Sequence, residues 1–231
     1  MIKFENTEVT GWEAAIRGMR NPMNSWEKSD SFEFPPDDDG TPYIGPNDYK
    51  LMKSLRESGT DHRKFMRMIT VYLDIISPLY FLKELDTYKI GTVANSCSTM
   101  HKIAAKEFTL EDFSCEHLFD DYSLEEQLTY GCSDTGDNNF CYTSKDALQV
   151  ICDILNHHRF MYLQTKDKKY WWQMIQLLPS SYNQKRTIML NYEVLANIYK
   201  SRQNHKLDEW RDFCKWIKTL PYSELITGEI E

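Results

Sequence analysis

Apolar and polar residues alternate along the chain in patterns that predict both helices and strands. The first 20 residues predict a short strand followed by a helix at 11–20. Residues 47–58 carry apolar side chains at helical spacing and end at a glycine, which favours a second helix. The stretch 65–76 is rich in β-branched and aromatic residues and predicts a buried strand. Pro78 is expected to open a helix over 79–89, because proline is tolerated in a first helical turn.

The second half of the chain is mainly helical in pattern. We expect helices at about residues 144–164, 170–178, 186–202 and 207–220. The small polar residues of 90–105 predict no regular structure before Ile103, and 34–40 predicts a loop. Residues 107–142 hold a turn cluster and predict a surface excursion. Since no internal repeat or domain boundary is evident, we expect one α/β domain over residues 1–231.

The distribution of charge limits the class of ligand. The net charge of −8 argues against a protein that wraps DNA or RNA. Residues 106–150 nevertheless hold eleven acidic residues against two lysines, whereas residues 151–218 hold twelve basic residues against six acidic ones. A basic region in an acidic protein suits a small anionic ligand. The alternative is a pair of solvated faces that neutralise each other.

Several classes of protein are not indicated. The N-terminus lacks a basic segment followed by an apolar run, and the most apolar stretch, 68–82, is too short to cross a membrane. We therefore expect a cytoplasmic protein. The six cysteines lack the close spacing of a zinc site and are expected to be free thiols. Adjacent His157 and His158 cannot ligate one ion from the same helix face, so no metal site is predicted.

The segment from Leu178 to Glu209 carries polar groups that could meet a nucleotide. Within the expected helix, Asn191 and Arg202 are eleven residues apart, which places them on one face about 16 Å from each other. Arginine is suited to bidentate phosphate contact, and amides are suited to the edges of a uracil or flavin ring. The structural alternative is that Arg202 only caps its helix and pairs with Glu209.

The same segment resembles the C-terminal signature of the flavin-dependent thymidylate synthases. That family has Leu-Pro, an Asn twelve residues after the Pro, an Arg eleven residues later, and a His-Ala-Gln-x-Glu run. Here Leu178-Pro179 is followed at those spacings by Asn191 and Arg202, and 205–209 matches the run with one loop residue deleted. Asn197 falls where the family has an asparagine that touches the flavin.

The first half of the chain follows the family in the order of its elements, with 106–150 as a divergent acidic insertion. The family's Arg-His-Arg and Asn-Glu-x-Ser-x-Arg motif is altered, because Thr87-Tyr88-Lys89 occupies the basic trio. Of this motif, the type of side chain is kept at Lys89, Asn95 and Ser98. Ser96 replaces the Glu, and Met100 replaces the Arg. The Arg of the family's Asn-x-Arg is also replaced, by Glu193, which would repel a phosphate.

The resemblance implies a central twisted sheet flanked by helices, in a homotetramer that holds FAD and dUMP at subunit interfaces. It implies methylation of dUMP to dTMP with FAD, reduced nicotinamide (NADPH) and methylenetetrahydrofolate. The flavin contacts would be Asn191, Asn197, His205 and Lys89. The nucleotide contacts would be Arg202, Ser98 and Asn95, of which Arg202 and Ser98 would be catalytic.

Two other functions remain open on the sequence. The loss of the basic trio and the presence of Glu193 favour a nucleotide- or flavin-binding protein that has lost the reaction. An enzyme that uses the flavin on another nucleotide or base is the third possibility. In each case the partner is a small-molecule nucleotide rather than a nucleic acid polymer or a membrane.

Overall fold

A computed structural model describes residues 2–32, 42–121, 128–131 and 139–228. The contacts within it form two compact units. We call 2–76, 83–96 and 185–231 the sheet unit, and 77–82 and 97–184 the helical unit. The loop predicted at 34–40 lies outside the described residues. The expectation of a single domain stays a prediction.

The sheet unit is built on a four-stranded sheet with the strand order β1-β2-β6-β3. Its strands are β1 (Lys3–Thr10), β2 (Thr70–Pro78), β3 (Val93–Ser96) and β6 (Asn183–Asn191). β1 runs antiparallel to β2, and β3 runs antiparallel to β6. Its helical segments are α1 (Trp12–Arg20), η1 (Asn21–Met23), η2 (Trp26–Lys28), α2 (Pro46–Glu57), η3 (Arg63–Arg67), α7 (Tyr192–Arg202), α8 (Asp208–Ile217) and α9 (Glu224–Thr227). This mixture of helices and sheet confirms the predicted fold class.

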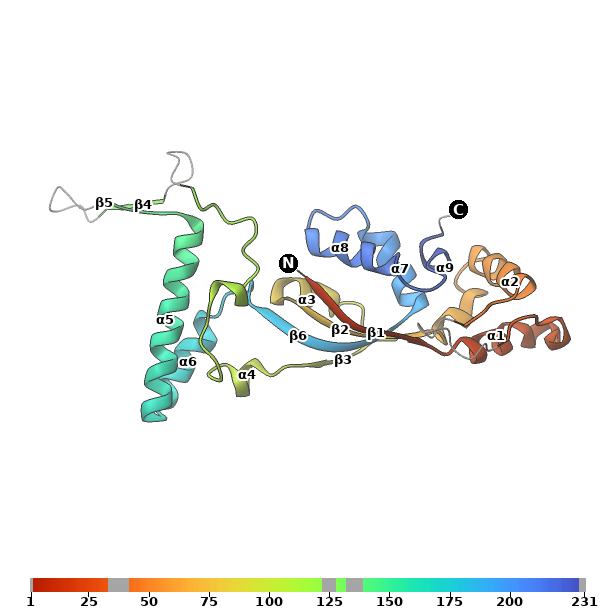
Figure 1. The fold of residues 1–231 in the computed structure, drawn as a ribbon, viewed down its shortest axis with the longest axis horizontal. Helices are drawn as coiled ribbons and strands as arrows, with labels where there is room; N and C mark the ends of the chain where they lie inside the picture. The colour runs from red at the N-terminus through yellow and green to blue at the C-terminus, as the bar shows by residue number, and fades with distance from the viewer. Residues whose placement is uncertain (1, 33–41, 122–127, 132–138, 229–231) are drawn as a thin grey trace. The chain divides into compact units, whose positions relative to one another are not determined.

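One face of the sheet packs against helices. Val71, Leu73 and Ile75 of β2 are fully buried, whereas Tyr72 between them is 42% exposed. This alternation is the period of two that a half-covered strand requires. Figure 1 shows α7 and α8 on the covered face, and the ring of Phe4 in β1 stacks on Trp216 of α8 with centroids 5.4 Å apart. The core of this unit therefore lies between the sheet and these two helices.

The helix predicted at 186–202 is wrong over its first third. Residues Asn183–Asn191 form the central strand β6, and the helix begins only at Tyr192. Ile188 and Leu190 are buried while Thr187 is exposed and Met189 is half-buried, which is strand alternation rather than a helical stripe. Because β6 gains its backbone partners from β2 and β3, the sheet overrides any local helical preference.

Other boundaries also differ from the prediction. The strand expected from residue 65 starts at Thr70, because η3 precedes it and buries Phe65. The helix expected to reach Lys89 is α3 (Leu79–Leu85), and 86–92 forms a loop instead. The absence of regular structure expected before Ile103 is contradicted by β3 and by α4 (Thr99–Lys102). All four residues of β3 are exposed, so no burial pattern marked this edge strand.

The helical unit contains a pair of packed helices, α5 (Ser144–Thr165) and α6 (Lys168–Leu177). Its core includes Leu155 and Met174, both fully buried, together with Phe108 and Phe113. The prediction of a surface excursion over 107–142 is therefore wrong at its start, because two phenylalanines there supply core rings. Further segments are η4 (Leu110–Asp112) and a hairpin of β4 (Leu128–Gly131) and β5 (Asn139–Tyr142).

The remaining predicted helices are confirmed. The segments expected at 11–20, 47–58, 144–164, 170–178 and 207–220 correspond to α1, α2, α5, α6 and α8. Each has an apolar face or a capping signal that acts locally. Among the described residues, none of the helices combines the length and apolar character needed to cross a membrane.

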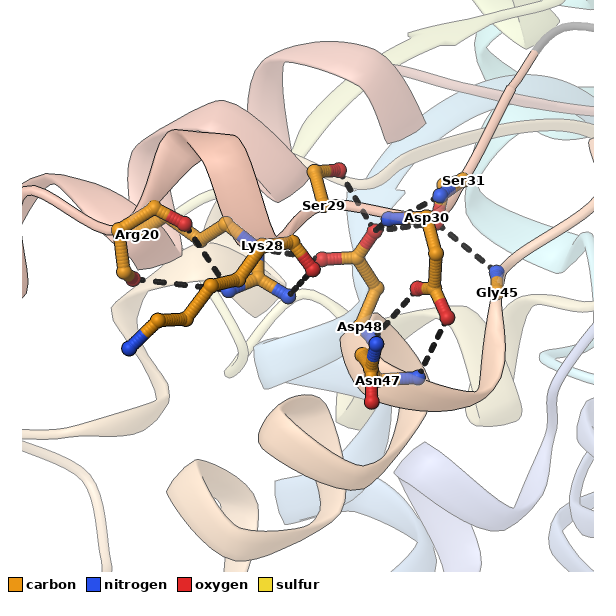
Figure 2. Close-up of polar contacts among 9 residues, drawn as sticks. Arg20, Lys28, Ser29, Asp30, Ser31, Gly45, Asn47 and Asp48 are labelled. Atoms are coloured by element: carbon orange, nitrogen blue, oxygen red, sulfur yellow. Dashed lines mark hydrogen bonds and ion pairs between the residues drawn. The ribbon is translucent and has the colours of Figure 1, made fainter.

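A buried ion pair fixes the chain between α1 and α2. The Arg20 guanidinium Nε donates to Asp48 at 2.6 Å, and the two side chains are 4% and 0% exposed. Figure 2 shows the carboxylate of Asp48 meeting the hydroxyls of Ser29 and Ser31, at 2.7 and 2.6 Å. The Arg20 guanidinium also donates to the carbonyl oxygens of Ser25 and Lys28, both at 3.1 Å. This pair thereby joins α1 and α2 to the segment 25–31 that connects to them.

Candidate functional site

Arg202, the residue on which the nucleotide prediction rests, lies at the C-terminal end of α7 on an aromatic wall. Its Nε donates to the Tyr88 hydroxyl at 3.0 Å, and its guanidinium carbon lies 4.8 Å from the ring centroid of Trp210. Its Nη1 lies 3.3 Å from a carboxylate oxygen of Glu84. Among the described residues, its Nη2 makes no hydrogen bond, so the guanidinium keeps open donors.

Glu84, at the end of α3, connects the groups around Arg202. One carboxylate oxygen accepts a hydrogen bond from the Trp210 indole N–H at 2.8 Å and also faces Arg202. The Nε2 of His205 is 4.0 Å from the same oxygen. Since the Nδ1 of His205 accepts the N–H of Leu207 at 3.2 Å, the ring proton of neutral His205 resides on Nε2 and faces Glu84.

Asn191 holds the start of α7 against the loop 86–92. Its side-chain oxygen accepts the N–H of Val194 at 3.0 Å, which makes Asn191 the N-cap of α7. Its amide nitrogen donates to the carbonyl oxygen of Gly91 at 3.5 Å. Gly91 has φ +79°, and a Cβ atom there would come within 2.7 Å of that nitrogen. Asn191 and Arg202 therefore lie at opposite ends of α7, and Asn191 is the N-cap rather than a residue inside a helix that starts at 186.

A cavity of about 430 Å³ opens beside this loop within the sheet unit. The loop side chain of Lys89 lines it, as do Asp86 at the end of α3 and Arg186 on β6. Arg186 Nη1 lies 2.7 Å from the Asp86 carboxylate. Lys89 is exposed and forms no ion pair with any described residue. The cavity has the size of a small-ligand site and carries more positive than negative charge.

The charge reversal at Glu193 is neutralised by Arg63 of η3. The Arg63 Nε is 2.8 Å from one carboxylate oxygen of Glu193, and its Nη2 donates to the other at 3.1 Å. The same Nη2 donates to the side-chain oxygen of Asn197 at 3.2 Å. Glu193 is only 6% exposed, so it is a paired, buried carboxylate rather than a free negative charge that faces a ligand. The expectation that it would repel a phosphate is wrong for this reason.

The predicted site residues fall into separate groups in the structure. Arg202 and His205 meet around Glu84, while Asn191 contacts the loop 86–92 that carries Lys89. Asn197 is exposed one turn along α7, and Asn95 is exposed on the edge strand β3. Ser98 belongs to the helical unit, where its hydroxyl accepts the N–H of His101 at 3.1 Å and caps α4. Their roles toward flavin and nucleotide stay predictions.

The sequence pattern did not reveal several residues of this region. Glu84, Tyr88 and Trp210 come from three separate elements, and only the tertiary structure brings them to Arg202. Arg186 lay inside a segment predicted as helix, where its direction could not be foreseen. Ile188 and Leu190 follow Arg186 at two and four positions, and this alternate spacing was the one sequence signal that the three side chains share a strand face.

The architecture defines the class of the protein: the chain has the flavin-dependent thymidylate synthase fold. It resembles the crystal structure of ThyX from Helicobacter pylori with FAD and dUMP, at TM-score 0.64 and 17% identity, over 99% of this chain and 98% of that one. It also resembles the UMP/dUMP methylase PolB from Streptomyces cacaoi bound with 5-Br dUMP, at TM-score 0.58 and 14% identity, over 99% and 95% of the two chains. By sequence the chain matches no protein-family model and none of the curated proteins.

Proposed function

We propose that this protein is a flavin-dependent methylase of a uracil nucleotide, with dUMP as its substrate and dTMP as its product. The observation that carries the proposal is the correspondence of fold over nearly the whole of both chains, which holds for a neighbour crystallised with FAD and dUMP. The open donors of Arg202 and the cationic cavity beside the loop 86–92 add sites for an anionic nucleotide and for a phosphorylated cofactor.

The residues of the sheet unit fit such ligands. The backbone at Gly91 is exposed, and the space that a Cβ would fill is taken by Asn191, so the loop packs tightly against α7. Lys89 offers an ammonium group, and the guanidinium carbon of Arg202 lies 4.8 Å from the ring centroid of Trp210 and 5.9 Å from that of Tyr88. These groups bind and orient, which is the role expected of the protein when cofactors supply the reacting carbons.

In the proposed reaction, bound reduced FAD would supply hydride while methylenetetrahydrofolate supplies the one-carbon unit, and NADPH would restore the reduced flavin. The products are dTMP, tetrahydrofolate and oxidised flavin. Arg202 would hold the pyrimidine through its Nη2 donors, and Glu84 would keep the guanidinium in place. Asn191, Asn197, His205 and Lys89 would contact the flavin, and Ser98 and Asn95 the nucleotide. We place this activity in the cytoplasm.

The proposal is tested by the colour and the activity of the purified protein. We expect visible flavin absorbance, and formation of dTMP from dUMP, methylenetetrahydrofolate and NADPH, followed by chromatography. Arg202→Ala should weaken dUMP binding by roughly 10- to 150-fold, the value of a hydrogen bond to a charged group. Arg17→Ala is the matched control, because Arg17 pairs with Glu13 on the exposed surface of α1 and should leave binding unchanged. A colourless protein that takes up no added FAD would contradict the proposal.

The second candidate is a nucleotide- or flavin-binding protein without the reaction. It is favoured by the Glu84 carboxylate, which already occupies part of the Arg202 guanidinium, and by the pairing of Arg63 with Glu193. A yellow protein that binds dUMP but forms no dTMP would support this candidate. The same assay with UMP in place of dUMP distinguishes it from an enzyme that acts on another nucleotide.

A further inference from the structure

The cavity beside the loop 86–92 combines an apolar wall with a cationic end. Ile188 and Leu190 of β6 are 3% and 1% exposed, and Leu85 of α3 closes the same wall. Arg186 precedes Ile188 by two residues and so projects from the same face of the strand. A strand thus places one guanidinium at the end of a strip of buried aliphatic side chains.

The guanidinium of Arg186 is held in position by an exposed carboxylate. Its side chain is 13% exposed, whereas that of its partner Asp86 is 50% exposed. Asp86 can therefore turn into solvent at little cost, while Arg186 stays at the cavity wall. An arriving anion would replace a solvated carboxylate, and the planar guanidinium suits two oxygens of one phosphoryl group.

Lys89 supplies a second cation to the lining of this cavity. It is exposed, lines the cavity and makes no ion pair within the described part of the chain. With Arg186 and Lys89 against Asp86, the cavity carries one net positive charge. Like charges repel each other, so an anion bound beside both cations would be favoured.

We infer that this cavity binds a phosphoryl group, with Arg186 as its bidentate ligand, Lys89 as its second cation and Asp86 as the displaceable competitor. The apolar wall then contacts the carbon skeleton that carries the phosphate. This inference rests on the proposed function, in which a phosphoryl group is present both in the flavin cofactor and in the nucleotide. It assigns to the site a strand residue, Arg186, outside the loop and α7.

The inference is tested by dissociation constants measured by calorimetry for pairs of probes that differ in phosphate. The pairs are FAD with riboflavin and dUMP with deoxyuridine, and inorganic pyrophosphate serves as a probe without a base. We expect Arg186→Gln to weaken the phosphorylated member of one pair, and pyrophosphate, by roughly 10- to 150-fold. The unphosphorylated member should bind as before. The pair that responds identifies the source of the phosphate.

Two further variants separate a ligand-binding role from a structural one. Asp86→Asn removes the carboxylate charge that competes for Arg186 and should tighten binding of the same probes several-fold, opposite in sign to Arg186→Gln. If the ion pair were only structural, both substitutions would weaken binding alike. Lys185→Gln is the matched control, because the neighbouring Lys185 pairs with Glu5 and Asp74 on the other face of β6. Thermal unfolding of each variant checks that the fold is kept.

The outcomes separate this inference from the proposed function. Binding that depends on Arg186 in a protein that forms no dTMP supports the inference and contradicts the function. Formation of dTMP with affinities that Arg186→Gln leaves unchanged contradicts the inference alone. Equal losses in Arg186→Gln and Lys185→Gln, or no binding of any phosphorylated probe by the unmodified protein, would also overturn the inference.

Discussion

At the scale of single residues, buried charges in this protein are paired and hydrogen-bonded. Arg20 with Asp48 and Arg63 with Glu193 join segments that are distant in sequence. Burial of an isolated charge is costly, so each pair makes its two segments depend on each other. The sequence shows these residues only as ordinary charged positions, because nothing local marks which of them will be buried.

The ion pair of Arg20 predicts a large loss of stability on truncation. Arg20→Met should lower the free energy of unfolding by about 3–5 kcal/mol, since it leaves the Asp48 carboxylate buried without its cation. Arg17→Met, on the same helix, removes an exposed partner of Glu13 and should cost no more than about 1 kcal/mol. Urea unfolding followed by circular dichroism measures both values. Equal losses in the two variants would contradict the structural role of the Arg20 pair.

The carboxyl of Asp48 predicts a dependence of stability on pH. Burial by itself would raise the pKa of Asp48, but hydrogen bonds from Ser31, Ser29 and Arg20 outweigh it and hold the pKa below its ordinary value. Because the folded pKa is depressed, the contribution of Asp48 is full above the unfolded pKa of about 3.9 and is lost as the pH falls through the folded value. Urea unfolding at pH 7 and at pH 3 should show less acid loss in Asp48→Asn than in the unmodified protein.

At the scale of elements, α7 depends on one side chain at each end. Asn191 caps its first turn and reaches Gly91, while Arg202 at its last residue meets Glu84 and Tyr88. The loop 86–92 is therefore tied to both ends of the same helix. The position of any ligand bound at this loop would follow the position of α7.

The cap predicts a graded response to substitution at Asn191. Asn191→Ala should destabilise the protein by about 0.5–2 kcal/mol, since the N–H of Val194 loses its acceptor. Asn191→Asp keeps an acceptor for that N–H but loses the donor to Gly91, so its unfolding free energy should fall less. Urea unfolding compares the three proteins. If Asp and Ala cost the same, the cap is not the source of the effect.

At the scale of the whole molecule, β3 forms one edge of the sheet, and within the described part of the chain no strand pairs with its outer side. Val93 of β3 is 62% exposed and Ile90 before it is 92% exposed. Exposed apolar side chains on an edge strand favour association, and the resemblance implies a homotetramer.

Assembly is tested by light scattering after size-exclusion chromatography. We expect a mass four times that of the 231-residue chain. Val93→Lys should shift the protein toward smaller species, because it places a charge on the exposed edge. Val150→Lys, on the exposed surface of α5 in the helical unit, serves as its control. A monomeric mass for the unmodified protein would contradict the tetramer.

The sequence by itself determined the helices whose signals are local. The helical patterns at 47–58 and 144–164 and the apolar stripe near the C-terminus predicted α2, α5 and α8 within a few residues. The resemblance at 178–209 also indicated the fold that the comparison with solved structures found.

The tertiary structure alone decided the central strand and the surroundings of Arg202. β6 carries a residue run that suits either a helix or a strand, and its hydrogen bonds to β2 and β3 selected the strand. Glu84 and Arg202 are far apart in sequence, so no local pattern could join them. Secondary structure with a local signal can be predicted from neighbouring residues, whereas partners brought together by folding depend on the packing of the whole unit.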